Sequence, residues 1–175
     1  MFLFARPTLG SLVVGFVVVM VGEWVRFWGV SIAGSETRTT DTVGGTYLIT
    51  NGPFAYVRNP LYVGNILLYL GVGIMSRALF PWLFLIAGLW FCVQYYLIVT
   101  GEEEYLAERF GDAYREYTMN VPRFIPRFTP YRSGLPPPKI VDLQEGLASE
   151  RRTLQAIFLV TLLLVGIYVL LQAQG

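Results

Sequence analysis

Residues 51–73 decide the fold, and their sequence is NGPFAYVRNPLYVGNILLYLGVG. A polar, proline-containing loop carries one fixed cation, Arg58, and passes directly into an apolar helix that begins near Pro60 and contains several glycines. Charged side chains at the membrane level are costly and usually mark a functional site. The stretch therefore predicts a membrane helix with a site at its polar end.

The composition of the whole chain is that of a membrane protein. Of its 175 residues, 54% are hydrophobic and only 14% are charged, whereas charged residues make up about 25% of a typical soluble domain. The formal net charge is +1, and a nucleic-acid-binding surface needs a basic stripe to neutralise phosphates. The chain is thus predicted to be an integral membrane protein, with no nucleic-acid partner.

Two residue counts exclude whole classes of site. The chain contains no histidine and a single cysteine, Cys92. Without histidine there is no Ser-His nucleophile pair and no imidazole ligand for haem, and one cysteine builds neither a structural zinc site nor an internal disulfide. We therefore predict no metal site.

Hydropathy predicts an all-α fold in one membrane domain, residues 1–175, with about four transmembrane helices. Their expected ranges are residues 9–30, 61–76, 78–100 and 154–171. Because almost no loop separates the second and third spans, they should form a tight hairpin. The polar segments are residues 31–60 and 101–153, and residues 102–119 have the pattern of an amphipathic helix interrupted or bent at Gly111.

The first span has an alternative interpretation as a cleaved signal peptide, with Arg6 as its positive region. We disfavour it because Glu23 and Arg26 lie near the end of the apolar run, where a signal peptide is uncharged.

The distribution of Lys and Arg predicts the orientation of the chain. One side would hold two cations, Arg6 and Arg77, and the other side eleven: Arg26, Arg38, Arg58, Arg109, Arg115, Arg123, Arg127, Arg132, Lys139, Arg151 and Arg152. Both polar segments should then face the cytoplasm, and the expected location is a prokaryotic plasma membrane. The hairpin would place the Arg58 loop beside the acidic run 102–104, although acids at a helix start also favour the helix dipole.

Two blocks of this sequence resemble the isoprenylcysteine carboxyl methyltransferases and the related phospholipid methyltransferases. Residues 52–64, GPFAYVRNPLYVG, are similar to the family motif Gly-Pro-Tyr-x-x-x-Arg-His-Pro-x-Tyr-x-Gly. The second block follows in the expected order, in Glu102-Glu103, Leu106, Phe110-Gly111, Tyr114, Tyr117 and Val121-Pro122-Arg123. The sequence departs from the motif at Asn59, where the family usually has histidine. Asparagine can form hydrogen bonds but cannot titrate.

The resemblance implies S-adenosylmethionine as cofactor, an active site at the cytoplasmic end of the helices, and a lipophilic or lipidated acceptor that enters from the bilayer. The implied catalytic residues are Arg58, Asn59 and Tyr62. The implied cofactor-binding residues are Arg58, Asn59, Pro60, Tyr62, Gly64, Gly71, Gly73, Glu102 and Glu103. The sequence leaves the oligomeric state open.

Each proposed role has a plainer alternative. Arg58 would hold the methionine carboxylate of the cofactor, unless it is only a topology anchor. Glu102 or Glu103 would bind the ribose hydroxyls or the ammonium. The glycines would let the cofactor approach the backbone or, equally, let helices pack. Tyr62, Tyr69 and Trp90 would line an acceptor tunnel, although lipid contact is the commoner role, and for Arg123 and Arg127 contact with lipid headgroups is favoured over catalysis.

The predicted function is methyl transfer to an isoprenylcysteine-type carboxylate or a similar lipophile. A carboxylate is already nucleophilic at neutral pH, whereas an amine acceptor must first lose a proton. Phospholipid amine N-methylation is the main alternative, and a non-catalytic membrane protein that keeps the scaffold is another. A membrane reductase is disfavoured because the extra spans of such enzymes are missing.

Overall fold

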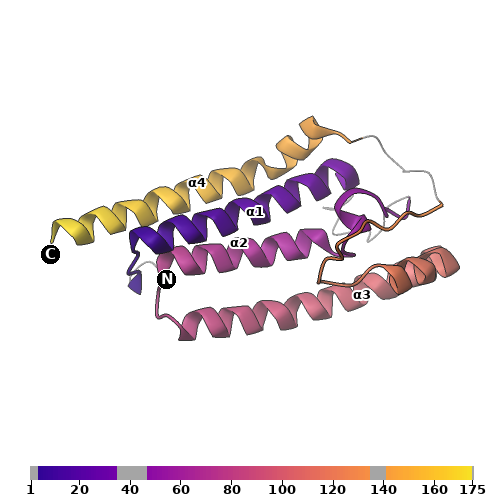
Figure 1. Ribbon diagram of the computed structural model, residues 1–175, viewed down its shortest axis with the longest axis horizontal. Coiled ribbons are helices and arrows are strands. Elements are labelled where there is room, and N and C mark those ends of the chain that lie inside the picture. Colours follow the sequence, from indigo (N-terminus) through magenta and orange to yellow (C-terminus); the bar gives the residue numbers. More distant parts are fainter. Residues whose placement is uncertain (1–3, 35–46, 135–140, 175) are drawn as a thin grey trace. The chain divides into compact units, whose positions relative to one another are not determined.

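The computed structural model describes residues 4–34, 47–134 and 141–174 (Figure 1). Within these ranges every regular element is helical. The elements are α1 (Leu9–Ala33), the short 3-10 helix η3 (Gly52–Ala55), α2 (Pro60–Ser76), α3 (Trp82–Asn120) and α4 (Leu143–Ala173). The all-α class of the prediction is confirmed.

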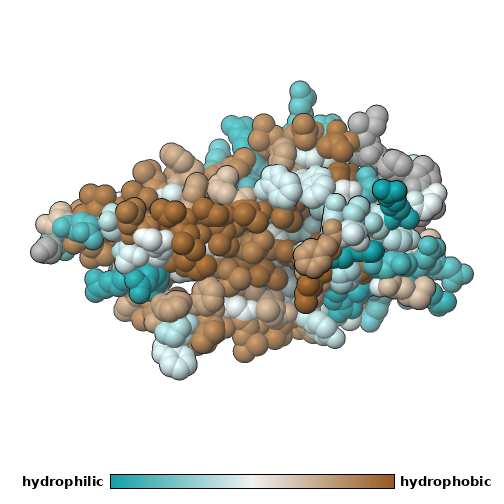
Figure 2. Space-filling view, viewed as in Figure 1, coloured by the Kyte–Doolittle hydropathy of each residue, from teal (hydrophilic) through white to brown (hydrophobic). Residues whose placement is uncertain are grey.

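Three helices, α1, α3 and α4, are long and apolar enough to cross a membrane, whereas α2 is apolar but has only 17 residues. The three long helices carry large apolar side chains on their exposed surfaces. Examples on α3 are Ile86, Leu89 and Trp90, each exposed by at least 65%. Figure 2 shows this hydrophobic surface in brown. Such surfaces are stable in contact with lipid, which supports the predicted membrane location.

The ends of two helices differ from the predicted ranges for local reasons. Helix α3 starts at Trp82 rather than at residue 78, because Arg77 and Leu79 adopt positive φ angles, of 48° and 47°, and form the turn after α2. Helix α4 starts at Leu143, well before residue 154. The Asp142 carboxylate accepts hydrogen bonds from the backbone N–H groups of Gln144 and Glu145, at 3.0 and 2.9 Å, and so caps the helix.

The chain divides into two compact units. The first unit comprises Met1–Trp24, Gly64–Val93 and Arg151–Gly175, and its core contains Leu12, Val19, Met75 and Leu164. In this unit α2 and α3 form the predicted hairpin, in which the Tyr69 and Phe91 rings stack with centroids 4.1 Å apart.

The second unit comprises Val25–Val63 and Gln94–Glu150. Its core contains Tyr114, Tyr117 and Val121. A buried ion pair joins the end of α1 to the start of α4, where the Arg26 guanidinium donates to both oxygens of the fully buried Glu150 carboxylate, at 2.9 and 2.8 Å.

Helix α3 reverses its direction at Gly111. This residue has φ 53° and ψ −124°, a combination that is accessible almost only to glycine. Glu103 and Arg123 are 20 positions apart and hydrogen-bond to each other, whereas a straight helix of that length would separate them by about 30 Å. The predicted interruption at Gly111 is therefore confirmed, and α3 has an outgoing limb, residues 82–110, and a return limb, residues 112–120.

Candidate functional site

Arg58, Glu103 and Arg123 form a compact group in the second unit, which we call the arginine–glutamate cluster. The Glu103 carboxylate lies between the two guanidinium groups. Its Oε1 is 3.4 Å from Arg58 Nη1, and its Oε2 accepts a hydrogen bond from Arg123 Nη2. The side chains of Arg58 and Glu103 are only 15% and 12% exposed. The predicted approach of the Arg58 loop to the acidic run is thus present.

Backbone pairing holds the Arg58 loop in place. The loop follows η3, and its Arg58 N–H donates to the Pro122 carbonyl at 2.9 Å. Asn59 adds a side-chain bond one residue later, because its Nδ2 donates to the Arg123 carbonyl at 3.1 Å. Residues 58 and 59 are therefore anchored to the segment that supplies Arg123, which fixes the two arginines relative to each other.

Tyr62 and Glu102 form a second polar pair next to Glu103 in sequence. The Tyr62 hydroxyl donates to Glu102 Oε1 at 2.6 Å, and the Tyr62 ring packs on Tyr95 with centroids 4.9 Å apart. Pro60 is fully buried at the first position of α2, where the missing N–H costs nothing. The start of α2 thus presents Tyr62 to the outgoing limb of α3.

The acidic run 102–104 does not begin a helix. It lies within the outgoing limb of α3, which starts at Trp82. The expectation of a helix start at Glu102 was wrong, because the apolar span and the amphipathic segment form one continuous helix. Stabilisation of a helix N-terminus therefore does not account for these acids.

Two buried polar atoms of the cluster are unsatisfied. Arg58 Nε and Glu103 Oε1 are both inaccessible to solvent and make no hydrogen bond with the part of the chain that the structure describes. Buried polar atoms are nearly always hydrogen-bonded, so exceptions need an explanation. One of these atoms belongs to a cation and the other to an anion, and the two side chains face each other as an ion pair. A ligand that carries both charges would supply the missing hydrogen bonds.

Arg123 and Tyr114 lie at the arginine–glutamate cluster, and the sequence analysis assigned neither of them to the candidate site. Headgroup contact was favoured for Arg123, but its guanidinium binds Glu103 and lies over the Tyr96 ring at 5.3 Å from the centroid. The Tyr114 side chain is buried, and this burial, together with the Glu103 carboxylate, raises the pKa of its phenol to about 12. Both residues belong to the second motif block, and this membership could have identified them from the sequence.

The predicted glycines have helix contacts in the first unit. A Cβ on Gly71 would lie 2.6 Å from a Val19 methyl and 2.7 Å from the Gly15 carbonyl, so Gly71 allows α1 and α2 to approach closely. Gly73 faces the Phe84 ring, and Gly64 is buried. These contacts correspond to the packing role that glycine commonly has between membrane helices.

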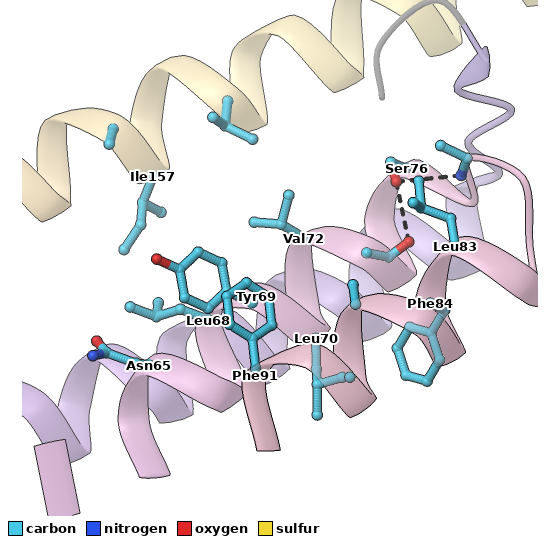
Figure 3. Close-up of a pocket in the computed structure, with 16 residues that line it drawn as sticks. Asn65, Leu68, Tyr69, Leu70, Val72, Ser76, Leu83, Phe84, Phe91 and Ile157 are labelled. Carbon is cyan, nitrogen blue, oxygen red and sulfur yellow. Dashed lines mark hydrogen bonds between the residues drawn. The ribbon is translucent and has the colours of Figure 1, made fainter. Parts of the chain in front are cut away.

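The first unit also contains an apolar cavity of about 540 Å³ between α2, α3 and α4 (Figure 3). The stacked Tyr69 and Phe91 rings form part of its wall. The Ser76 hydroxyl at its edge donates to the Gly73 carbonyl and accepts from the Ala78 N–H, at 3.1 and 3.3 Å. Because this hydroxyl is already satisfied, the cavity suits an aliphatic chain.

Residues 11–113 match the family model described as phospholipid methyltransferase. The chain belongs to this family. The matched region includes Arg58, Tyr62, Glu102 and Glu103 but ends before Arg123 and helix α4. Membership in the family confirms the resemblance that the two motif blocks carry.

Three curated proteins are similar in sequence to this chain. The cobalt-zinc-cadmium resistance protein CzcN of Cupriavidus metallidurans is 34% identical over 71% of this chain and 51% of its own length. The nickel-cobalt-cadmium resistance protein NccN of Alcaligenes xylosoxydans xylosoxydans is 30% identical over 70% of this chain and 53% of its own. The protein-S-isoprenylcysteine O-methyltransferase of Schizosaccharomyces pombe is 40% identical over 45% of this chain and 33% of its own.

The chain spans about half the length of the first two relatives. No solved structure matches it.

Proposed function

We propose that this protein is a membrane methyltransferase that uses S-adenosylmethionine and a lipophilic acceptor. The observation that carries the proposal is the pair of buried, unsatisfied atoms in the arginine–glutamate cluster, Arg58 Nε and Glu103 Oε1. The amino-acid end of S-adenosylmethionine carries one carboxylate and one ammonium. The cluster therefore offers one complementary charge for each.

Each residue of the cluster would have a separate task. The Arg58 guanidinium would hold the carboxylate, because its planar set of N–H groups matches carboxylate geometry. Glu103 would accept from the ammonium through Oε1, while Arg123 keeps Oε2 occupied and so fixes the carboxylate orientation. Tyr62 and Glu102 would bind the ribose hydroxyls.

S-adenosylmethionine supplies an electrophilic methyl group on a sulfonium ion. In this kind of displacement the protein mainly aligns the reactants and excludes water. Both tasks are compatible with a site that lacks histidine. Asn59 would act by position, since its amide holds the Arg123 carbonyl and carries no titrating proton.

The acceptor would be lipophilic, with a carboxylate as the reacting group. The apolar cavity of the first unit has a lining that suits the lipophilic part of such an acceptor. A carboxylate needs no proton removal before it reacts, whereas an amine does. The Schizosaccharomyces pombe relative is named for an O-methyltransfer, which supports an oxygen acceptor over the nitrogen of a phospholipid amine.

Methyl transfer itself can be tested with S-adenosylmethionine that carries an isotopically labelled methyl group. The purified protein would be incubated with this cofactor and with separate lipid fractions, including isoprenylcysteine analogues and phosphatidylethanolamine, and the products analysed by mass. We expect label in an ester of the carboxylate acceptors, and Glu103→Gln should strongly reduce it when the cofactor is not saturating. Label in the phosphatidylethanolamine fraction alone would contradict the carboxylate assignment.

A non-catalytic role is the second candidate, and the observation that favours it is Asn59 at the position where the family usually has histidine. The relatives CzcN and NccN are named as resistance proteins, which is compatible with such a role. Binding of S-adenosylmethionine without labelled product from any lipid fraction would favour this candidate.

A further inference from the structure

The segment that follows α3 returns to the polar end of the apolar run of that helix. The apolar run of α3 ends at about Thr100, where the acidic run begins. Arg123 Nη1 lies 3.5 Å from the Thr100 hydroxyl, and the Arg123 guanidinium covers the ring of Tyr96, one turn deeper in the helix. Because α3 reverses at Gly111, the segment after it brings Arg123 beside the end of the apolar run.

Three neighbouring apolar side chains of this segment are exposed, and we call them the apolar knob: Ile125, Pro126 and Phe128. The relative exposure is 80% for Ile125 and 103% for Phe128. A fully exposed phenylalanine in water gains nothing from the hydrophobic effect. Adjacent exposed apolar side chains are a common sign of an interaction surface.

The exposure of the knob is fixed by the surrounding hydrogen bonds. Between its members, the Arg127 N–H donates to the Tyr56 carbonyl at 2.9 Å, and Arg127 Nη1 donates to the Asn120 carbonyl at 2.8 Å. On the far side the Tyr131 N–H donates to the Ala55 carbonyl at 2.9 Å. The backbone is therefore held on both sides of Phe128, and the ring is presented outward.

We propose that the apolar knob inserts into the headgroup layer of the leaflet next to the end of α3. Arg123, two residues before the knob, contacts Thr100 at the polar end of the apolar run, and aromatic side chains are enriched where such runs meet the lipid headgroups. Arg127 between its members and the exposed Arg132 after it add positive charge that complements lipid phosphates. The inference does not depend on methyl transfer.

The insertion has a consequence for the candidate site. The same segment is hydrogen-bonded to the loop that carries Arg58, through the Pro122 carbonyl and the Arg127 N–H. The depth at which the knob rests in the leaflet therefore sets the depth of the arginine–glutamate cluster relative to the lipid surface.

A fluorescent probe can measure the surroundings of Phe128 directly. Cys92 is the single cysteine of the sequence, so Cys92→Ser provides a background without reactive thiols. In this background Phe128→Cys would be labelled with a polarity-sensitive fluorophore, with Arg115→Cys as the matched control. Arg115 belongs to the return limb, and its side chain is 77% exposed.

Both labelled proteins would be reconstituted in phospholipid vesicles that contain a spin-labelled lipid as quencher. We expect a blue-shifted emission at position 128, with lipid quenching several-fold stronger than at position 115 and with weaker quenching by aqueous iodide. Ile125→Cys should give the same emission shift and quenching as Phe128→Cys. Agreement between the two positions would show that the result does not come from a local distortion caused by either substitution.

Two results would overturn the proposal. If positions 125 and 128 respond to iodide and lipid quencher as position 115 does, the knob lies in water. If their emission is blue-shifted without quenching by the spin-labelled lipid, a protein surface covers the knob instead of the leaflet.

Discussion

At the scale of single residues, Asn59 connects the loop before α2 to the segment after α3. Its side-chain amide donates to the Arg123 carbonyl at 3.1 Å, so its role in the structure is that of a hydrogen-bond donor. An imidazole N–H can supply the same donor. The histidine that the family usually has at this position is therefore compatible with the same anchoring contact.

Substitutions at Asn59 can distinguish the effect of losing the hydrogen-bond donor from the effect of changing the side-chain size. Asn59→Leu is similar in size but leaves the Arg123 carbonyl without its partner, so we expect a loss of about 1 kcal/mol in stability. Asn59→His should lose less stability than Asn59→Leu, because an imidazole N–H can replace the donor. Thermal unfolding in detergent, followed by circular dichroism, measures both. Equal unfolding temperatures for Asn59→Leu and the parent protein would contradict this role.

The contact of Arg58 with Glu103 was predictable from the hairpin, whereas the contact of Arg123 with Glu103 was not, although Arg123 belongs to the second motif block. The short hairpin between the second and third apolar segments brings their polar ends together, and the sequence shows that hairpin. Arg123 reaches Glu103 only because α3 reverses direction. Local pattern shows that Gly111 interrupts a helix, but the size and direction of the turn depend on packing of Leu106 and Phe110 against Tyr117 and Val121.

At the scale of elements, the reversal of α3 depends on one backbone conformation. Gly111 has φ 53° and ψ −124°, where a side chain costs about 1–3 kcal/mol. We expect Gly111→Ala to lower the unfolding temperature. Gly101→Ala, elsewhere in the same helix, meets nothing within 4 Å and has no positive φ, so it should stabilise the helix by up to about 1 kcal/mol.

The comparison of these two alanine variants uses thermal unfolding in the same detergent. A Gly111→Ala protein as stable as Gly101→Ala would show that the reversal tolerates a side chain and would contradict the conformational argument.

Some helix boundaries are set by the local sequence, and others depend on contacts between residues far apart in the chain. The apolar spans could be located from composition, since about 20 consecutive apolar residues cross a bilayer. The continuation of α4 to Leu143 depends on the Asp142 cap and on the buried pair of Glu150 with Arg26, which are 124 positions apart. Sequence pattern alone does not pair residues at that separation.

At the scale of the whole molecule, the side of the membrane on which the cluster lies depends on the charge distribution. Eleven Lys and Arg residues are predicted on one side and two, Arg6 and Arg77, on the other. The positive-inside rule then favours a cytoplasmic location for both polar segments. A cytoplasmic site would also have direct access to S-adenosylmethionine, a soluble metabolite.

Cysteine accessibility tests this orientation. In the Cys92→Ser background, Arg77→Cys and Arg115→Cys would be expressed in a bacterium and exposed to a membrane-impermeant maleimide. We expect labelling of position 77 in intact cells, and of position 115 only after the membrane is opened. The reverse pattern would show that the polar segments face outward.

The most direct test of the central claim is the binding of S-adenosylmethionine measured by calorimetry in detergent. The parent protein should bind, and Arg58→Ala and Glu103→Gln should each weaken binding by about ten- to a hundredfold, because each loses a charge-assisted hydrogen bond. Arg115→Ala, whose exposed side chain pairs only weakly with Asp112, should bind as the parent does. If Arg58→Ala and Glu103→Gln also bind as tightly as the parent, the arginine–glutamate cluster is not the cofactor site.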